Sequence, residues 1–187
     1  AATRIEDAPR SIPAGTEIND NAYRKFSWSL GPYTRTSFFD PDSPLRIQVG
    51  VRASARWDLG RGLSFNGSVT KRVAGNLREI TRTSNSVLPR VRSNAALYFQ
   101  QGDPSLERLT ADYLFKLSPS VYGRVSAGYP ESMFGGVSTE VLWKPVGKRY
   151  ALGAELNYVK QRDFDQRFGF RNYDVLTGHV SGYYKFK

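Results

Sequence analysis

The stretch LRIQVGVRASARWDL, residues Leu45–Leu59, divides its side chains into an apolar set and a polar set. The apolar set occupies every second position and consists of Leu45, Ile47, Val49, Val51, Ala53, Ala55, Trp57 and Leu59. A β-strand is the only regular element that places alternate residues on opposite faces. Soluble strands are usually about 5–6 residues long, so an alternation of this length is more typical of a tilted strand that crosses a membrane.

The same alternation recurs along the rest of the chain. It predicts seven further strands, at roughly Arg24–Phe39, Leu63–Thr70, Arg108–Leu117, Val121–Tyr129, Val137–Lys144, Tyr150–Val159 and Leu176–Phe186. Short and longer connections alternate between these strands, as they do in outer-membrane barrels. We therefore predict an all-β fold, an antiparallel transmembrane β-barrel of the outer membrane, with about eight strands in this chain that form part of a larger barrel.

The predicted barrel segment covers residues 23–187 and contains one long loop at about 74–104. Residues 1–22 are polar, contain two prolines and are interpreted as an extended leader. Within the loop, Val91–Gln101 fits either a ninth strand or a short helix with Ser93 or Asn94 as N-cap and Gly102 past its end. A ninth strand would break the alternation of connection lengths, so the loop interpretation is favoured.

A soluble barrel or sandwich with its apolar face inside is the alternative architecture. Large aromatic residues near the strand ends argue against it, namely Trp57, Tyr129, Trp143, Tyr150 and Tyr158. Membrane barrels place such rings in girdles at the two lipid interfaces. The sequence therefore favours the membrane barrel.

Composition excludes several classes of function. The chain has a net charge of +10, no cysteine and a single histidine, His179, so neither a disulfide framework nor a cysteine or multi-histidine metal site is possible. No glycine-rich phosphate loop or nucleophile motif occurs, and the basic residues do not form a nucleic-acid-binding module. We predict no enzymatic activity, no cofactor and no nucleic-acid partner.

Arginines on the predicted polar faces are the main functional candidates. They are Arg46, Arg52, Arg56, Arg108 and Arg124, and rings of arginine favour anions in pores. We predict that they bind a polyanion in the lumen. The alternative is structural pairing with Asp58, Asp112, Glu140 and Glu155, which share those faces. Basic loop residues are candidates for contact with lipid phosphate, namely Arg72, Arg78, Arg82, Arg90 and Arg92.

Longer motifs resemble a known family. They are Leu88–Ser93, Ala127–Val137, Glu140–Pro145, Leu152–Phe170, Tyr173 and Thr177–His179. These stretches resemble the YjbH family of exopolysaccharide-biosynthesis outer-membrane proteins, which is related to the group 4 capsule protein GfcD. The strongest part includes a loop with Gln161, Arg162, Asp163, Asp165, Gln166 and Arg167. A salt-bridged loop explains Asp163 and Asp165 more simply than a catalytic carboxylate pair.

The resemblance implies an outer-membrane β-barrel that serves exopolysaccharide or capsule export, and it implies no catalytic residues. The expected partners are outer-membrane lipid, an acidic exopolysaccharide, and other export-machinery proteins or the remainder of the barrel. Tyr184 and Phe186 only partly fit a terminal assembly signal, which suggests that the chain stops inside a larger barrel. The alternative functions are a non-conducting scaffold barrel for periplasmic partners and an outer-membrane enzyme.

Overall fold

The computed structural model describes residues 24–40, 43–81 and 94–186, and it contains a single eight-stranded antiparallel sheet. The strands are β1 (Phe26–Asp40), β2 (Ser43–Gly60), β3 (Leu63–Gly75), β4 (Ser105–Ser118), β5 (Val121–Tyr129), β6 (Phe134–Trp143), β7 (Tyr150–Arg162) and β8 (Phe170–Tyr184). Each pairs with its neighbour in sequence, in the order β1 to β8. All eight strands predicted from the alternation are confirmed.

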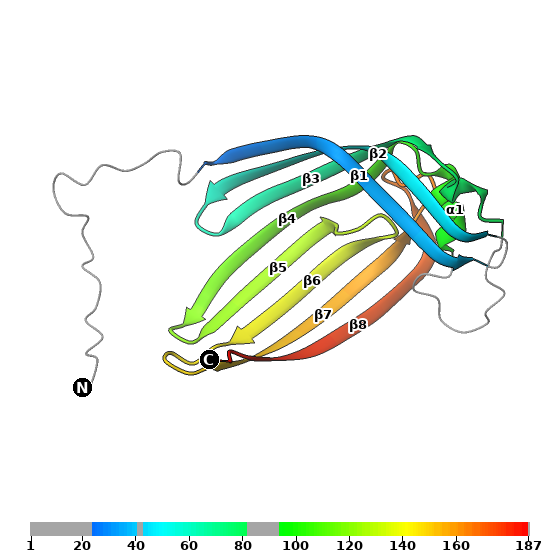
Figure 1. The fold of residues 1–187 in the computed structure, drawn as a ribbon. Coiled ribbons are helices and arrows are strands. Elements are labelled where there is room, and N and C mark those ends of the chain that lie inside the picture. The colour runs from blue at the N-terminus through cyan, green and yellow to red at the C-terminus, as the bar shows by residue number, and fades with distance from the viewer. Residues whose placement is uncertain (1–23, 41–42, 82–93, 187) are drawn as a thin grey trace.

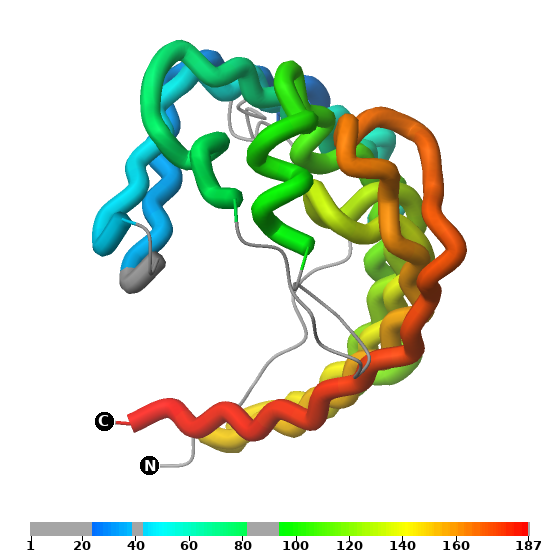
Figure 2. Tube along the Cα trace, turned by 90° about the vertical axis from the view of Figure 1, so that its right-hand side faces the viewer, coloured from blue at the N-terminus to red at the C-terminus, as the bar shows by residue number. Residues whose placement is uncertain are grey.

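The sheet curves into an arc and does not close (Figure 1, Figure 2). Within the described residues, β1 and β8 each pair with one strand only and therefore form the two edges. Figure 2 shows these edges bordering the open side of the arc. The structure thus shows the eight antiparallel strands as an open sheet, and the barrel predicted from sequence stays a prediction.

One short α-helix lies on the concave side of the arc. It is α1 (Ala95–Gln101), preceded by the 3₁₀ helix η1 (Leu77–Glu79). Asn94 and Gly102 bound α1, as expected from sequence, although the Asn94 side chain forms no capping hydrogen bond. The helical interpretation is therefore confirmed for residues 95–101, while residues 91–93 and the predicted leader, 1–22, lie outside the described part.

The two faces of the sheet have opposite polarity. Apolar side chains on the convex face are exposed, for example Leu156 at 53% and Val180 at 87%. Polar side chains on the concave face are buried, for example Thr110 at 2% and Gln48 at 6%. The buried apolar cluster is small and consists of Leu77, Ile80 and Ala96 with Phe99 packed against it. This polarity is the reverse of a soluble sheet, whose apolar face packs on a core.

The connections differ at the two ends of the sheet (Figure 1). Residues 61–62, 119–120 and 144–149 join strands at one end, which we call the turn end. At the opposite end, the loop end, β1 is followed by β2, β3 by β4, β5 by β6 and β7 by β8, and the described connecting residues there are 76–81, 94–104, 130–133 and 163–169. Gly62 completes the β2–β3 turn at φ +86°, and a Cβ there would collide with the Leu114 carbonyl oxygen. Predicted short and longer connections thus segregate to opposite ends.

Aromatic rings gather near both ends of the convex face. At the turn end, Trp57 lies 6.5 Å from Phe65 and Trp143 lies 5.8 Å from Tyr150, between ring centroids. At the loop end, Tyr129 stacks on Phe170 at 5.4 Å. This is the arrangement that the aromatic positions in the sequence suggested.

In the ranges that the structure describes, no helix has the length and hydropathy needed to cross a bilayer.

Candidate functional site

All five candidate arginines lie on the polar, concave-facing set of positions, and each has a carboxylate nearby. The N–O distances are 3.9 Å for Arg46–Glu79, 2.6 Å for Arg52–Glu107, 3.9 Å for Arg56–Asp58, 3.7 Å for Arg108–Asp112, 3.0 Å for Arg124–Glu140 and 3.3 Å for Arg124–Glu155. The four acids proposed from sequence as pairing partners all take part. Each of the five arginines thus has a carboxylate partner, and polyanion binding by these arginines stays a prediction.

Burial separates Arg46 from the other four arginines. Arg46 is only 4% exposed, and its guanidinium donates to the Asn76 carbonyl at 3.3 Å. Asn76 also accepts a hydrogen bond from the Ile47 N–H through its side chain, at 2.9 Å. Arg46 therefore ties β2 to the loop before η1, whereas Arg52, Arg56, Arg108 and Arg124 remain partly accessible.

A β-bulge supplies a carboxylate that the alternation does not place on this face. The β3–β4 register jumps between Ser68↔Arg108 and Val69↔Leu106, which leaves Glu107 as the extra residue. Strict alternation would put Glu107 on the apolar face with Leu109, but a bulge re-aims side chains. An acidic residue at an apolar-face position was the available signal, and it was missed.

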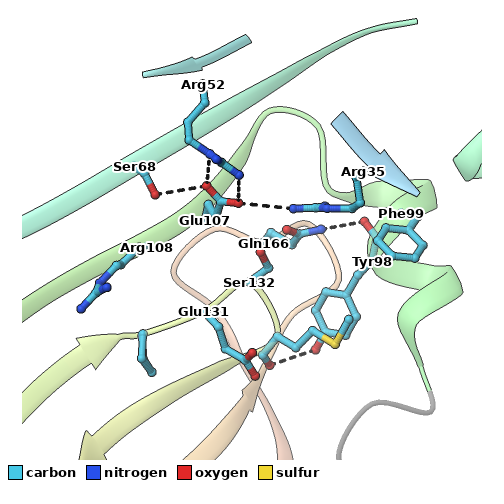
Figure 3. Close-up of a pocket in the computed structure, with 12 residues that line it drawn as sticks. Arg35, Arg52, Ser68, Tyr98, Phe99, Glu107, Arg108, Glu131, Ser132 and Gln166 are labelled. Atoms are coloured by element: carbon cyan, nitrogen blue, oxygen red, sulfur yellow. Dashed lines mark hydrogen bonds and ion pairs between the residues drawn. The ribbon is translucent and has the colours of Figure 1, made fainter. Parts of the chain in front are cut away.

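Glu107 bridges two neighbouring strands by binding two arginines (Figure 3). Its carboxylate pairs with both nitrogens of the Arg52 fork, at 2.6 and 2.7 Å, and accepts from Arg35 at 3.4 Å. Ser68 also lies within 3.3 Å of it. Two-point pairing fixes the geometry of a guanidinium as well as its charge. One carboxylate thus serves two cations, which leaves an excess positive charge beside it.

A cavity of about 590 Å³ opens next to this cluster (Figure 3). Arg35, Arg52 and Glu107 line one wall, and Phe99 of α1 and Glu131 of the β5–β6 loop line others. Such a lining offers charged donors, carboxylate acceptors and an aromatic surface together. Small-molecule sites combine apolar walls with a few placed polar groups, and this combination suits a hydroxylated, acidic ligand.

The family-like loop is built around one buried guanidinium. Arg162 is 0% exposed and donates to the carbonyl oxygens of Leu106, Glu131, Gln166 and Arg167 at 2.6 to 2.8 Å. Its guanidinium also stacks 4.7 Å from the Tyr129 ring. The sequence suggested a loop held by salt bridges. The structure shows instead that the Arg162 guanidinium holds the loop by hydrogen bonds to backbone carbonyl oxygens. Asp165 instead accepts from the Arg167 N–H at 3.0 Å, a local turn contact.

Tyr98 attaches α1 to this loop. Its hydroxyl donates to the Arg162 carbonyl at 2.6 Å, and its ring meets Phe164 edge-on at 5.1 Å. Burial raises the pKa of Tyr98 to about 12. Gln166, 1% exposed, donates to the Tyr98 carbonyl at 2.7 Å and accepts from Ser105. A Cβ at Gly102 would collide with the Gln166 amide, so the residue after α1 has to be glycine.

Asp103 lies just after the C-terminal end of α1 and connects it to β3. Its carboxylate accepts from the Arg72 backbone N–H and from Lys71, both at 3.0 Å. Burial alone would raise the pKa of Asp103, but these hydrogen bonds outweigh burial and lower it below the ordinary value. Arg72, one of the proposed lipid-contacting residues, is thus committed to Asp103 and to the Phe99 carbonyl. Arg82, Arg90 and Arg92 lie outside the described residues.

The lowered pKa predicts a pH dependence for the attachment of α1. A carboxyl group with a depressed folded-state pKa stabilises the fold above its unfolded pKa and loses this contribution as pH falls through the folded value. We expect amide hydrogen exchange in residues 95–101 to accelerate below about pH 4 relative to pH 7, after correction for intrinsic rates. Asp103→Asn should remove most of this difference. Equal acid sensitivity in that variant would contradict the assignment.

The fold and this lining define an all-β protein whose apolar side chains face outward and whose charged groups converge inside an open arc. The chain belongs to the YjbH family, because the family model described as "Exopolysaccharide biosynthesis protein YbjH" matches residues 1–187. The resemblance seen at about 88–187 is therefore confirmed and extends over the whole chain.

One relative is the "Uncharacterized lipoprotein YjbH" of Escherichia coli (strain K12), which is 34% identical over 191 aligned residues. The alignment covers 98% of this chain and 27% of the relative, so the chain spans about a quarter of that protein's length. No solved structure matches the chain.

Proposed function

We propose that this chain forms an arc of an outer-membrane β-barrel that helps an anionic exopolysaccharide leave the cell. The observation that carries the proposal is the reversed polarity of the sheet. Exposed apolar side chains cover the convex face, and polar side chains cover the concave face. A contiguous apolar surface of this extent is costly in water and marks contact with lipid or with another protein. Membrane barrels have an apolar band outside and a polar interior.

The open edges support completion by further strands. In the described chain, β1 and β8 carry unpaired backbone groups along one side each. Each unpaired backbone group costs roughly several kcal/mol in a bilayer, so a sheet that spans the membrane has to close. The remainder of the barrel is thus one proposed partner, and outer-membrane lipid is another. The Escherichia coli relative is named a lipoprotein, which supports a membrane location.

The charge arrangement supports weak contact with a polyanion. Arg35 and Arg52 share Glu107, so this part of the concave face carries more positive than negative charge. The nearby carboxylates keep these arginines from binding an anion tightly, which favours passage over retention. Family membership in exopolysaccharide biosynthesis supplies the class of polymer. We propose that the protein acts without catalysing a reaction.

A non-conducting scaffold barrel is the second candidate, and one observation favours it. α1 lies inside the arc at the loop end and is fixed to two loops through Tyr98. A lumen occupied in this way would conduct little. The scaffold would then anchor periplasmic proteins of the export machinery.

The test is conductance of the full-length protein in planar bilayers, with an acidic polysaccharide added to one side. We expect open channels that the polymer blocks. Arg52→Glu should weaken the block severalfold because it reverses the charge beside Glu107, whereas Lys160→Glu, an exposed position on β7, should not. The same variants are scored for secreted polymer in cells.

Three results would count against these proposals. Absence of channels together with unchanged secreted polymer after deletion of the gene would overturn both candidates. Absence of channels with reduced secreted polymer would overturn passage through the barrel and favour the scaffold. Cleavage of the polymer by purified protein would contradict the non-enzymatic role.

A further inference from the structure

A second cavity lies at the turn end of β6, β7 and β8, away from the Glu107 cluster. It measures about 570 Å³. Its lining includes Glu140 and Leu142 of β6, Ala151 of β7, and Tyr183 of β8. Ala151 is 7% exposed and lies opposite Tyr183 in the β7–β8 register, while Tyr183 itself is 55% exposed. A small residue beside a large one leaves the tyrosine ring accessible as a flat surface.

The cavity is strongly cationic. Four of its lining residues are basic, namely Lys144, Lys148, Arg149 and Lys185. Among the residues that the structure describes, none of these four forms an ion pair, and all four are exposed. The acid in the lining, Glu140, is already bound to Arg124 at 3.0 Å. This cluster therefore differs from the arginines along the sheet, each of which has a carboxylate beside it.

Position on the sheet distinguishes a polymer from a lipid as the ligand. Tyr183 shares the β8 face of His179, which lies opposite Glu155 on the concave side. The adjacent Tyr184 lies opposite Tyr150 and packs against Phe186 at 5.2 Å, in the outward aromatic group. Tyr150 and Tyr184 thus form the outward rim of the cavity, along which a lipid headgroup would approach, whereas a ligand on Tyr183 lies inside the arc.

We propose that this turn-end pocket binds an acidic sugar unit of a polysaccharide. The ring face of the sugar lies on Tyr183, and its carboxylate or phosphate lies among Lys144, Lys148 and Lys185. Aromatic faces provide large, stiff contact surfaces, and ammonium groups form charge-assisted hydrogen bonds with such anions. A cationic opening also raises the local concentration of a polyanion. The inference deepens the proposed function, on which it rests for the polymer.

The test measures binding of a galacturonic acid hexamer to the full-length protein in detergent, with maltohexaose as the neutral probe. We expect the acidic hexamer to bind and the neutral one to bind at least tenfold more weakly. Tyr183→Ala should weaken acidic binding about fivefold, or about 1 kcal/mol, because it removes the aromatic face on which the sugar ring lies. Tyr184→Ala tests the outward rim of the same cavity. Tyr158→Ala, an exposed outward tyrosine of β7 that lies outside the lining, is the matched control and should change binding less than twofold.

The charge contribution has its own pair of variants. Lys148→Gln with Lys185→Gln should weaken acidic binding about fivefold, because each exposed ionic contact contributes only modestly. Lys160→Gln with Arg167→Gln removes the same charge at the loop end and should leave binding unchanged. Added salt should weaken acidic binding and not neutral binding.

Three results would overturn the proposal. Equal binding of the two hexamers would exclude charge recognition. A loss in Tyr184→Ala in place of Tyr183→Ala would place the contact on the outward rim and not inside the arc. Acidic binding that survives all turn-end variants and is lost in Arg52→Glu would place the contact at the Glu107 cluster, and the proposed function would then stand without this pocket.

Discussion

Replacing Ala53 with arginine is expected to prevent stable insertion of the protein into a bilayer. Ala53 lies within β2 on the exposed convex face, opposite Leu30 and Val69. An arginine on the lipid-facing side of a barrel costs about 2–4 kcal/mol near the bilayer midplane. The measurement is folding of the full-length protein into lipid vesicles, followed by protease protection and by the mobility shift of folded barrels in unheated gels.

The neighbouring residue supplies the control for this prediction. Ser54 points to the opposite face, where it lies opposite Ser29 and Ser68 and lines a cavity of about 400 Å³. This cavity has room for an arginine side chain, so Ser54→Arg should insert nearly as well as the unmodified protein. Equal insertion of both variants, or a larger defect in Ser54→Arg, would contradict an outward-facing lipid surface.

Replacing Arg162 with methionine is expected to release α1 and the loops at the loop end. Methionine keeps much of the volume but removes the donors to four backbone carbonyls. Each buried polar group left without a partner costs about 1–3 kcal/mol. Even if water hydrogen-bonds to some of the four carbonyls, we expect the free energy of unfolding to fall by about 3 kcal/mol or more. The midpoint of urea unfolding should fall, and amide exchange in residues 95–101 should accelerate.

Arg167 is the matched control for Arg162, because it belongs to the same loop and is exposed. Arg167→Met should change the unfolding midpoint little, since exposed charges contribute about 0–1 kcal/mol. Tyr98→Phe tests the next contact, because it removes the hydroxyl that donates to the Arg162 carbonyl. If Arg162→Met and Arg167→Met behave alike, Arg162 does not organise the loops.

The alternation of side chains predicted the strands well because it is a local property. Period-two spacing fixes which face each residue occupies once the chain is extended. The positions of all eight strands, the inward direction of Arg52 and Arg124, and the short helix that begins at Ala95 could therefore be derived from neighbouring residues alone. The five arginines were correctly placed on one face for the same reason.

The tertiary structure decided what these groups contact. The bulge at Glu107 depends on how β3 and β4 align, and it turns an apparently outward acid toward Arg35 and Arg52. The burial of Arg162 depends on three loops that meet at one end of the sheet, and no periodic signal reports such a meeting.

The sequence by itself thus determined the strands, the two faces and the family to which the chain belongs. Only the folded sheet determined which charges neutralise one another, and which have no ion-pair partner in the part of the chain that the structure describes, as at Lys148 and Lys185. The physical reason is distance: side-chain direction follows from adjacent peptide units, whereas an ion pair or a buried hydrogen bond requires residues far apart in sequence to lie within about 3–4 Å.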